Sequence, residues 1–108
     1  MTPSPGEIWL AEILFTDGSA SKIRPVLVLW LDAADSVVAA VTSAAPRSTS
    51  DVPLQNWQAE GLRVASTVRL SRLDCLEQNV LRRKLGALSS GDAQRIKQIW
   101  ANQIQPRF

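Results

Sequence analysis

The sequence has 108 residues, a length typical of one compact domain, and 45% of them are hydrophobic, which is enough to form a buried core. The formal net charge is +2, but residues 1–54 carry a balance of −3 and residues 55–108 a balance of +5. This composition excludes a disordered chain and a polybasic arm, and it predicts that the C-terminal half offers a positive surface to a polyanion.

Several residue types that enzymes commonly use are missing. The absence of histidine excludes a Ser-His-Asp triad and a paired-histidine ribonuclease mechanism, and we expect no metal site and no cofactor. The single cysteine, Cys75, cannot form an internal disulfide, and we interpret it as a small apolar filler. The longest apolar run, Val26 to Leu31, is too short to cross a bilayer, so we expect a cytoplasmic protein with no membrane partner.

Three strands are predicted in the N-terminal half, after a short tail at residues 1–5. The apolar patterns indicate strands at Glu7–Leu14, Pro25–Leu31 and Val37–Thr42. A turn-rich loop at Phe15–Ile23 separates the first two strands. The second strand should be buried on both faces, and the polar turn Asp32–Ser36 joins it to the third strand as an antiparallel hairpin.

The C-terminal half contains one segment that periodicity leaves undecided. Val52–Leu54 reads as a brief strand after a loop, whereas Ser66–Leu88 fits both strand and helix spacing. Ser89 and Asp92 form a variant of the capping box, and the apolar stripe that follows predicts a helix. Short strands with one terminal helix favour a mainly β or α+β barrel, in a single domain over residues 1–108.

The candidate site lies at the open end of the predicted hairpin. Arg24 precedes the second strand, and Thr42 and Ser43 end the third, so their side chains could come within reach of each other. A guanidinium and two hydroxyls can bind a phosphate and stabilise extra charge on it. The alternative for Arg24 is a salt bridge at the rim, with Asp17 or Glu12 as its partner.

Other conspicuous residues have plainer interpretations. Trp9 and Trp100 fall in apolar patterns and are predicted to lie in the core. Trp57 could stack on a base, shield the barrel or pack at a dimer contact. The run from Arg82 to Lys84 is either a track for RNA or a solvated face.

Segments in order along the chain resemble the MazF/PemK/Kid toxins over roughly residues 5–100. The matching segments are Gly6–Leu10, Thr16–Leu29, Val38–Ser43, Asp51–Leu54, Gly61–Leu62, Ser66–Val68 and Arg83–Gly86. The resemblance implies an SH3-like twisted β-barrel of antiparallel strands with a C-terminal α-helix, usually a homodimer. The undecided region would then be mostly strand, with a short helical turn near Leu76–Val80.

The resemblance also implies an activity and partners. The chain would be the toxin of a bacterial type II toxin–antitoxin pair and a metal-independent, sequence-specific endoribonuclease that cleaves single-stranded mRNA. Attack by the RNA 2′-hydroxyl would give a cyclic phosphate and a 5′-hydroxyl. Arg24 and Thr42 match the catalytic positions, and further RNA contacts are expected from Ser19, Lys22, Ser43 and Arg47. A cognate antitoxin would cover the groove, and the complex would bind its promoter DNA.

Two other functions remain open at this stage. A related barrel, the CcdB-like toxin, poisons gyrase without cutting RNA. A non-catalytic SH3-like module could instead act in binding or in transcriptional regulation. The Arg24-Pro25 and Thr42-Ser43 elements favour the ribonuclease, because gyrase poisoning needs no phosphate site.

Overall fold

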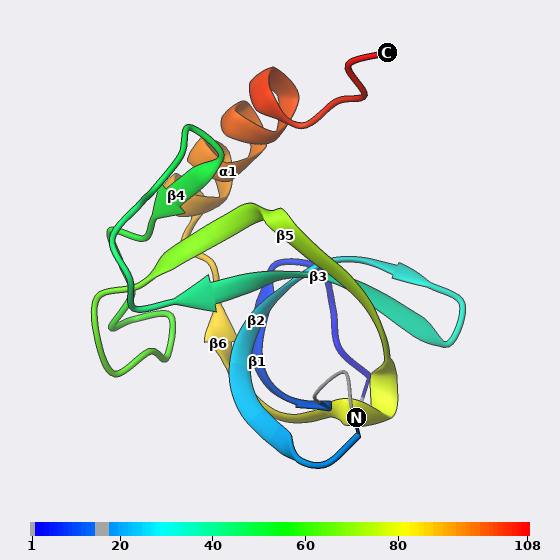
Figure 1. Ribbon diagram of the computed structural model, residues 1–108. Coiled ribbons are helices and arrows are strands. Elements are labelled where there is room, and N and C mark those ends of the chain that lie inside the picture. The colour runs from blue at the N-terminus through cyan, green and yellow to red at the C-terminus, as the bar shows by residue number, and fades with distance from the viewer. Residues whose placement is uncertain (1, 15–17) are drawn as a thin grey trace.

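The computed structural model describes residues 2–14 and 18–108, in which six antiparallel strands form one twisted sheet and a helix follows at the C-terminus (Figure 1). The elements are β1 (Glu7–Leu14), β2 (Ser21–Asp32), β3 (Asp35–Thr42), β4 (Asp51–Pro53), β5 (Thr67–Glu77), η1 (Gln78–Val80), β6 (Leu81–Ala87) and α1 (Ser90–Gln103). The strand order is β4-β5-β3-β2-β1-β6.

The central strand β2 pairs with β1 through its first half and with β3 through its second half. The predicted hairpin is therefore confirmed, with a two-residue turn between Asp32 and Asp35. The predicted loop Phe15–Ile23 is wrong at its end, because residues from Ser21 onward already pair with β1. Residues 15–17 of that loop lie outside the described residues.

Hydrophobic side chains are buried on both faces of the sheet. Alternate residues of β1 and β2 point to opposite sides, so Leu27 enters one core while Val26 and Val28 enter another. The first core comprises Ile8, Leu27, Ala39, Val41, Val52, Leu54, Val68, Leu70 and Ile96. The second core comprises Trp9, Ala11, Val26, Val28, Val38 and Leu81. The prediction that Pro25–Leu31 is buried on both faces is thus confirmed for Val26–Val28.

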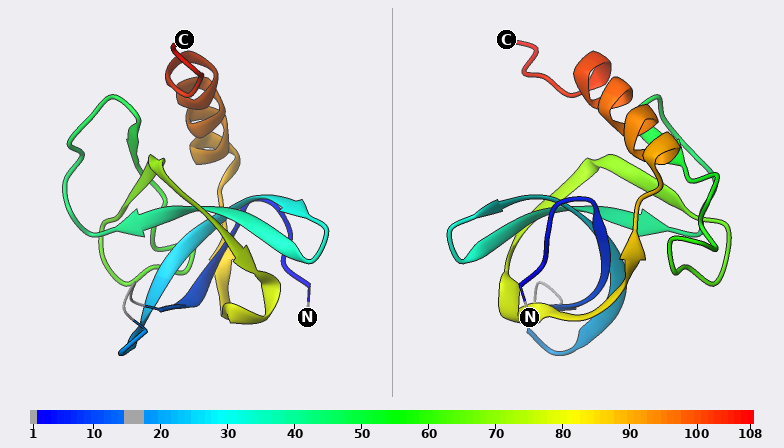
Figure 2. Two further views of the ribbon diagram at one scale, coloured as in Figure 1. Left: turned by 45° about the vertical axis from the view of Figure 1, so that its right-hand side comes forward. Right: turned by 180° about the vertical axis from the view of Figure 1, so that it is seen from behind.

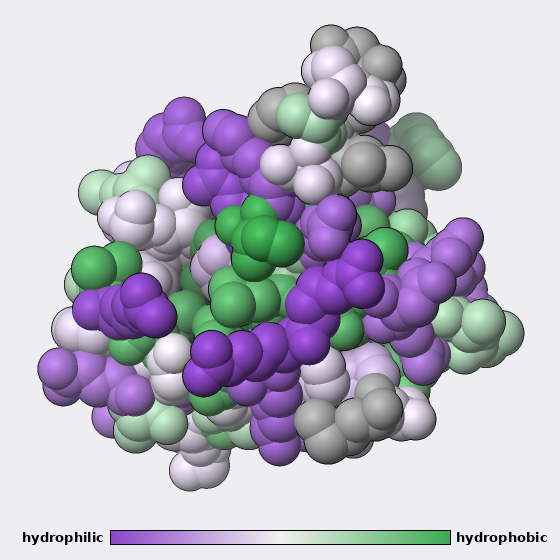
Figure 3. Space-filling view, turned by 90° about the horizontal axis from the view of Figure 1, so that it is seen from below, coloured by the Kyte–Doolittle hydropathy of each residue, from purple (hydrophilic) through white to green (hydrophobic). Residues whose placement is uncertain are grey.

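The sheet is strongly twisted, but it does not close into the expected barrel. Register shifts interrupt the β1–β6, β2–β3 and β3–β5 pairings, and such bulges increase the local twist of a sheet. The outer strands β4 and β6 stand at opposite ends of the strand order in the described chain. Seen from below, hydrophobic surface lies in the middle of the molecule, with strongly hydrophilic side chains around and over it (Figure 3).

The undecided region Ser66–Leu88 is two strands joined by a single turn of 3₁₀ helix, as the family resemblance implies. The strand β5 pairs with β3 over its length and with β4 near its start. The strand spacing therefore describes this region, and the helix spacing does not. The apolar residues of the region divide between the two strands. Val68 and Leu70 are buried on β5, and β6 begins with buried Leu81.

The helix α1 covers the first core beside β4 (Figure 2). Its predicted cap is confirmed, because the Ser89 hydroxyl accepts a hydrogen bond from Asp92 N. The reciprocal bond of a capping box is absent among the described residues, since Ser89 N donates to Glu60 Oε2 at 2.8 Å instead. Within the described chain, no helix is long and apolar enough to cross a membrane.

The predicted core positions of the two tryptophans differ in outcome. Trp9 is buried in the second core, as predicted. Trp100 is only half-buried against the first core, and its ring meets exposed Trp30 edge-to-face, with centroids 5.8 Å apart. The helical stripe therefore continues past the core to an aromatic pair at the surface.

Two glycines let the loop before β5 pack directly on β6. Gly61 adopts φ +93°, a left-handed conformation that favours glycine, and it lies against the backbone of Leu85. A Cβ at Gly86 would lie 2.6 Å from the carbonyl carbon of Glu60. Backbone therefore contacts backbone at this crossing, and no side chain fits between the two segments.

Gly86→Ala should lower the free energy of unfolding by about 1–3 kcal/mol, because the added methyl group forces the two backbones apart. Gly91→Ala is the matched control, since nothing lies within 4 Å of its Cβ position in the first turn of α1. Alanine should stabilise that helix by up to about 1 kcal/mol. Urea unfolding measures both variants, and equal stabilities would contradict the close packing.

The interpretation of Cys75 as an apolar filler is wrong, because its side chain is exposed on β5. In the sequence Cys75 lies between Asp74 and Leu76, so its immediate neighbours did not indicate which face of the strand it would occupy. Shielding from water and the negative charges of Asp35, Asp32 and Asp74 raise the pKa of the Cys75 thiol.

Alkylation of Cys75 by iodoacetamide should therefore reach half-maximal rate at a pH above the ordinary thiol pKa of about 8.5. Asp35→Asn should move that midpoint down, because one negative charge near the thiol is removed. Glu12→Gln makes the same change of charge elsewhere on the sheet and should leave the midpoint in place. A wild-type midpoint at or below the ordinary value would disprove this assignment.

Candidate active site

Arg24 and Thr42 lie just beyond the paired part of β2 and β3. The β2–β3 register ends at Val26 and Ala40, each two residues away from the candidate residue on its own strand, and both Arg24 and Thr42 line the same two surface hollows. Because side chains alternate along a strand, both lie on the face of the sheet that carries Val26 and Ala40. Arg24 is exposed and Thr42 is half-buried, so the pair borders the surface.

The hydroxyl of Thr42 is held in place by the backbone that follows it. Thr42 Oγ1 accepts a hydrogen bond from Ala44 N at 3.1 Å. That bond uses a lone pair of the oxygen, and among the described residues no acceptor takes the hydroxyl proton. The hydroxyl can therefore donate to a ligand that enters beside Arg24.

Arg24 has no ion pair with any described residue. Glu12, one of the two predicted partners, accepts from Ser21 Oγ and pairs with Arg82 at 3.1 Å. Asp17, the other predicted partner, lies outside the described residues. Within the part of the chain that the structure describes, the guanidinium of Arg24 thus keeps its hydrogen-bond donors available to a ligand.

A groove of about 470 Å³ opens on one side of the Arg24–Thr42 pair. It is lined by Leu10, Arg24, Pro25, Val41, Thr42, Ser43, Gly61, Leu62, Arg63, Val64, Ser66, Arg83 and Leu85. The lining combines hydroxyls and guanidinium groups with apolar side chains, and its volume falls in the range of small-molecule sites. We call it the main groove.

A smaller hollow of about 280 Å³ opens on the other side of the same pair. Its lining includes Arg24 and Thr42 again, and adds three further arginines, Arg47, Arg69 and Arg72. We call it the arginine hollow. The main groove and the arginine hollow together contain six arginines in the described chain, and neither is lined by an acidic residue. This side of the molecule is therefore suited to a polyanion.

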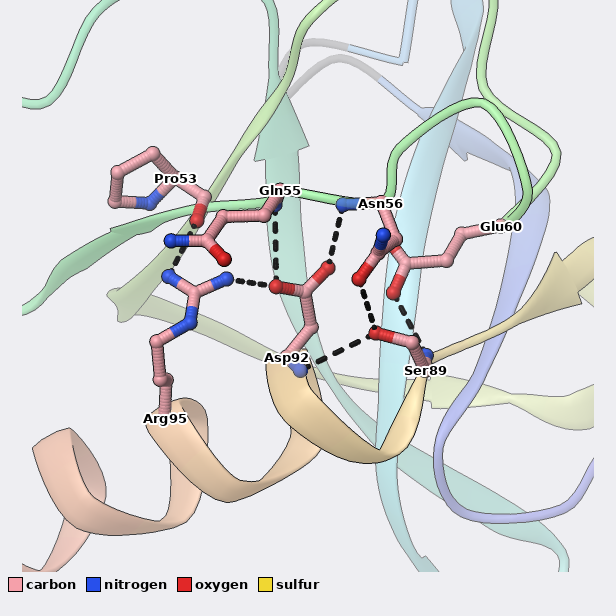
Figure 4. A network of polar contacts seen from close by, with 7 residues as sticks. All are labelled: Pro53, Gln55, Asn56, Glu60, Ser89, Asp92 and Arg95. Atoms are coloured by element: carbon pink, nitrogen blue, oxygen red, sulfur yellow. Dashed lines mark hydrogen bonds and ion pairs between the residues drawn. The ribbon is translucent and has the colours of Figure 1, made fainter.

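Two buried carboxylates tie the loop before β5 to the start of α1 (Figure 4). Asp92 accepts hydrogen bonds from Gln55 N and Asn56 N, both at 3.1 Å, and it pairs with Arg95. Glu60 accepts from Ser89 N. These contacts tie the loop before β5 to the first turn of α1. They fix the segment that carries Gly61, Leu62 and Arg63 into the main groove.

The predicted RNA contacts are only partly brought together. Ser43 lines the main groove and Arg47 lines the arginine hollow. Ser19 and Lys22 are exposed and line neither. Trp57 is half-buried against the first core and lines neither the main groove nor the arginine hollow.

The run from Arg82 to Lys84 does not act as one track. Arg82 pairs with Glu12, and Lys84 pairs with Glu7 at 2.9 Å, whereas Arg83 lines the main groove. Burial alone would raise the pKa of Glu7, but hydrogen bonds from Trp9, Lys84 and the backbone of Ser4 lower it overall. Glu7 is thus held as an anion, and it engages one of the cations of the run.

Sequence reasoning did not assign Arg63, Arg69 and Arg72 to the site. Arg69 alternates with buried Val68 and Leu70, so its direction could be predicted once β5 was known to be a strand. What the sequence did not provide was the partner strand. Pairing with β3 brings Arg69 opposite Ala40, which lies two residues before Thr42 on the same strand.

Comparison with known proteins identifies the class of molecule. Residues 4–103 match the family described as PemK-like, MazF-like toxin of type II toxin-antitoxin system. The match covers most of the sequence, and the chain belongs to this family of small β-sheet toxins. Among curated proteins, none matches the sequence significantly.

Solved structures of similar fold include toxins from two bacterial groups. The Mycobacterium tuberculosis toxin MazF-mt6 has a TM-score of 0.72 and 23% identity, over 89% of this chain and 93% of that one. An endoribonuclease in complex with its cognate antitoxin, from a mycobacterial species, has a TM-score of 0.76 and 17% identity, over 96% of this chain and 99% of that one. MazE-MazF from Deinococcus radiodurans has a TM-score of 0.67 and 22% identity, over 94% of each chain. At these identities the likeness shows a shared fold.

Asp92→Ala should lower the free energy of unfolding by roughly 3 kcal/mol, because it leaves Arg95 without its partner and two backbone N–H groups without an acceptor. Asp74→Ala removes an exposed carboxylate and should change stability by less than about 0.5 kcal/mol. Chemical unfolding provides the measurement. If the two substitutions had equal effects, Asp92 would not anchor the loop.

Proposed function

We propose that this chain is an endoribonuclease that cleaves single-stranded mRNA as the toxin of a type II toxin–antitoxin pair. The observation that carries the proposal is that the exposed residue Arg24, which has no ion pair with any described residue, lines the same two hollows as Thr42, whose hydroxyl oxygen is oriented by Ala44 N. The family match and the position of this pair between two arginine-lined hollows support it.

Cleavage proceeds by attack of the RNA 2′-hydroxyl oxygen on the adjacent phosphorus. A bond forms between the 2′-oxygen and phosphorus while the bond from phosphorus to the 5′-oxygen breaks. The 2′-hydroxyl loses its proton and the 5′-oxygen gains one, which leaves a cyclic phosphate and a 5′-hydroxyl. The RNA supplies its own nucleophile, so the protein has to bind the phosphate and stabilise its charge.

Arg24 and Thr42 have the chemistry for that task. Negative charge grows on the non-bridging oxygens as phosphorus becomes five-coordinate, and preorganised donors aimed at such charge lower the barrier. Arg24 presents a permanent positive charge with several donors, and Thr42 adds a neutral donor whose oxygen is already fixed by Ala44 N. Ser43 lines the same groove and supplies a further hydroxyl.

The main groove favours an unpaired strand as the substrate. Leu62 and Val64 give it apolar surface, and Val64 is 55% exposed, so the face of an unstacked base can cover them. Arg63 and Arg83 offer planar guanidinium groups that bind phosphates or stack on bases. A duplex keeps its bases inside and cannot use these contacts. A single strand can, so loop residues of the groove set the sequence that is cut.

The partners follow from the same surface. A cognate antitoxin with acidic residues would cover the arginines, and similar folds from mycobacteria and Deinococcus radiodurans were solved with their antitoxins or as MazE-MazF. A homodimer would bury the exposed apolar surface around Trp30 and Trp100.

We further propose that the complex of toxin and antitoxin binds promoter DNA. The toxin itself acts in the cytoplasm, where mRNA is translated.

Arg24→Ala should reduce the rate of cleavage of a long mRNA by about 10²–10³-fold in buffer containing EDTA, because one donor to the developing charge is lost. Arg82→Ala is the matched control. It removes an arginine that is paired with Glu12 outside both hollows, and cleavage should continue. Gel analysis of labelled RNA, with end-group identification of the cyclic phosphate, measures the reaction.

Two results would count against the ribonuclease. A folded wild-type protein that leaves diverse RNAs intact would remove the activity, and full activity in Arg24→Ala would remove the proposed chemistry. Circular dichroism of each variant shows whether the fold is retained. Trapped gyrase–DNA complexes formed by the wild-type protein would favour the gyrase-poison alternative instead.

A further inference from the structure

We propose that the arginine hollow binds a second phosphate of the RNA, next to the phosphate held by Arg24 and Thr42, and that Arg69 and Arg72 are its main ligands. This inference rests on the proposed function, because it deepens the description of the same substrate. It assigns binding to two residues of β5 that neither the sequence motifs nor the Arg24–Thr42 pair require.

The first argument is electrostatic. Four guanidinium groups line a hollow of about 280 Å³, and none of the described residues that line it is acidic. Like charges placed this close oppose folding unless a counter-charge is supplied. Asp51 pairs with Arg69, but the described residues offer Arg72 and Arg24 no ion pair, which leaves both of these charges available to an anionic ligand. A phosphodiester provides the counter-charge with oxygens that match the guanidinium fork.

The second argument is that Arg69 is oriented from behind. Its Nε lies 3.4 Å from Oδ1 of Asp51, a carboxylate whose side chain is only 1% exposed. The other oxygen, Oδ2, accepts from Arg47 N at 2.8 Å, so one buried carboxylate holds both Arg69 and the start of the Arg47 side chain. The described chain gives the terminal nitrogens of Arg69 no partner, and they remain available on the side of the hollow.

The third argument concerns shape. Arg69 pairs with Ala40 on β3, and Ala40 pairs with Val26 on β2. Ala40 is the smallest residue of this row, and it lines the hollow beside Arg69. A larger residue at position 40 would fill that space. With a volume of about 280 Å³ the arginine hollow is a concavity rather than a flat patch of surface cations.

The fourth argument is continuity with the main groove. Both hollows share the wall formed by Arg24, Pro25, Val41 and Thr42. A strand whose scissile phosphate sits on this wall can therefore reach both hollows with its neighbouring nucleotides. The arginine hollow would take backbone, since arginines dominate its charge, while the partly apolar main groove would take bases.

The test measures how strongly binding depends on salt. The probe is a pool of random-sequence RNA in which every 2′-hydroxyl is methylated, so that attack by the 2′-oxygen is impossible. Each phosphate contact adds about 0.7 to the slope of log affinity against log salt for single strands. Arg72→Gln should weaken binding and reduce that slope by about 0.7. Arg82→Gln, with the same loss of charge outside the hollows, should leave the slope unchanged.

Arg72 is the main variant because it is exposed and its replacement leaves no buried partner behind. Arg69→Gln should have the same effect on binding, but it also leaves Asp51 without its cation, so its thermal unfolding is measured alongside. In cleavage assays with unmodified RNA, Arg72→Gln should raise KM by more than it lowers kcat. That pattern indicates lost binding along the strand rather than lost chemistry at the scissile bond.

The outcomes separate this proposal from the proposed function. If the wild-type protein cuts RNA, and Arg72→Gln and Arg69→Gln both keep the wild-type affinity and salt slope, the second phosphate site is disproved while the ribonuclease stands. If the wild-type protein cuts no RNA but the slope falls in Arg72→Gln, the phosphate site stands and the ribonuclease fails. If Arg72→Gln and Arg69→Gln weaken the binding of a poly-glutamate peptide but leave RNA binding unchanged, the hollow binds carboxylates and the proposal is overturned.

Discussion

The candidate chemistry depends on the pairing of β2 with β3, which brings the ends of the two strands together. That pairing ends at Val26 and Ala40, two residues away from Arg24 and Thr42, and both of these residues line the same two hollows. Both strands are anchored by residues buried in two cores, one on each face of the sheet. A slip of one residue would turn Arg24 and Thr42 toward opposite faces. The cost of exposing both cores therefore protects the geometry of the pair.

Buried carboxylates organise the cations around this pair without neutralising the surface that they offer. Asp51 lies behind the arginine hollow, where it holds Arg69 and the backbone of Arg47. Glu60 and Asp92 lie behind the main groove, where they hold its loop against α1. A carboxylate at the surface of either hollow would compete with phosphate for the guanidinium groups. A carboxylate buried beneath the surface holds the residues of the hollow in place, while the surface open to a ligand keeps its positive charge.

The open sheet explains how so short a chain can carry an extended site. Here the strands twist but do not close, and two hollows flank the end of the central hairpin. The close contact between the backbones at Gly86 and Glu60 brings the loop of the main groove over β6. The residues that line the two hollows thus come from β1, β2, β3, β5 and β6, and from the loops on either side of β4.

The sequence by itself determined the elements that depend on local chemistry. Alternation and turn residues placed the hairpin, the Ser89 cap placed the helix, and family motifs marked Arg24 and Thr42. Only the tertiary structure decided which distant cations join them. Arg69 and Arg83 line the hollows because β5 and β6 pair where they do, whereas Arg82 and Lys84 are held by carboxylates on β1. It also placed Cys75 outside the core. Strand pairing brings together residues far apart along the chain, and no local periodicity encodes that choice.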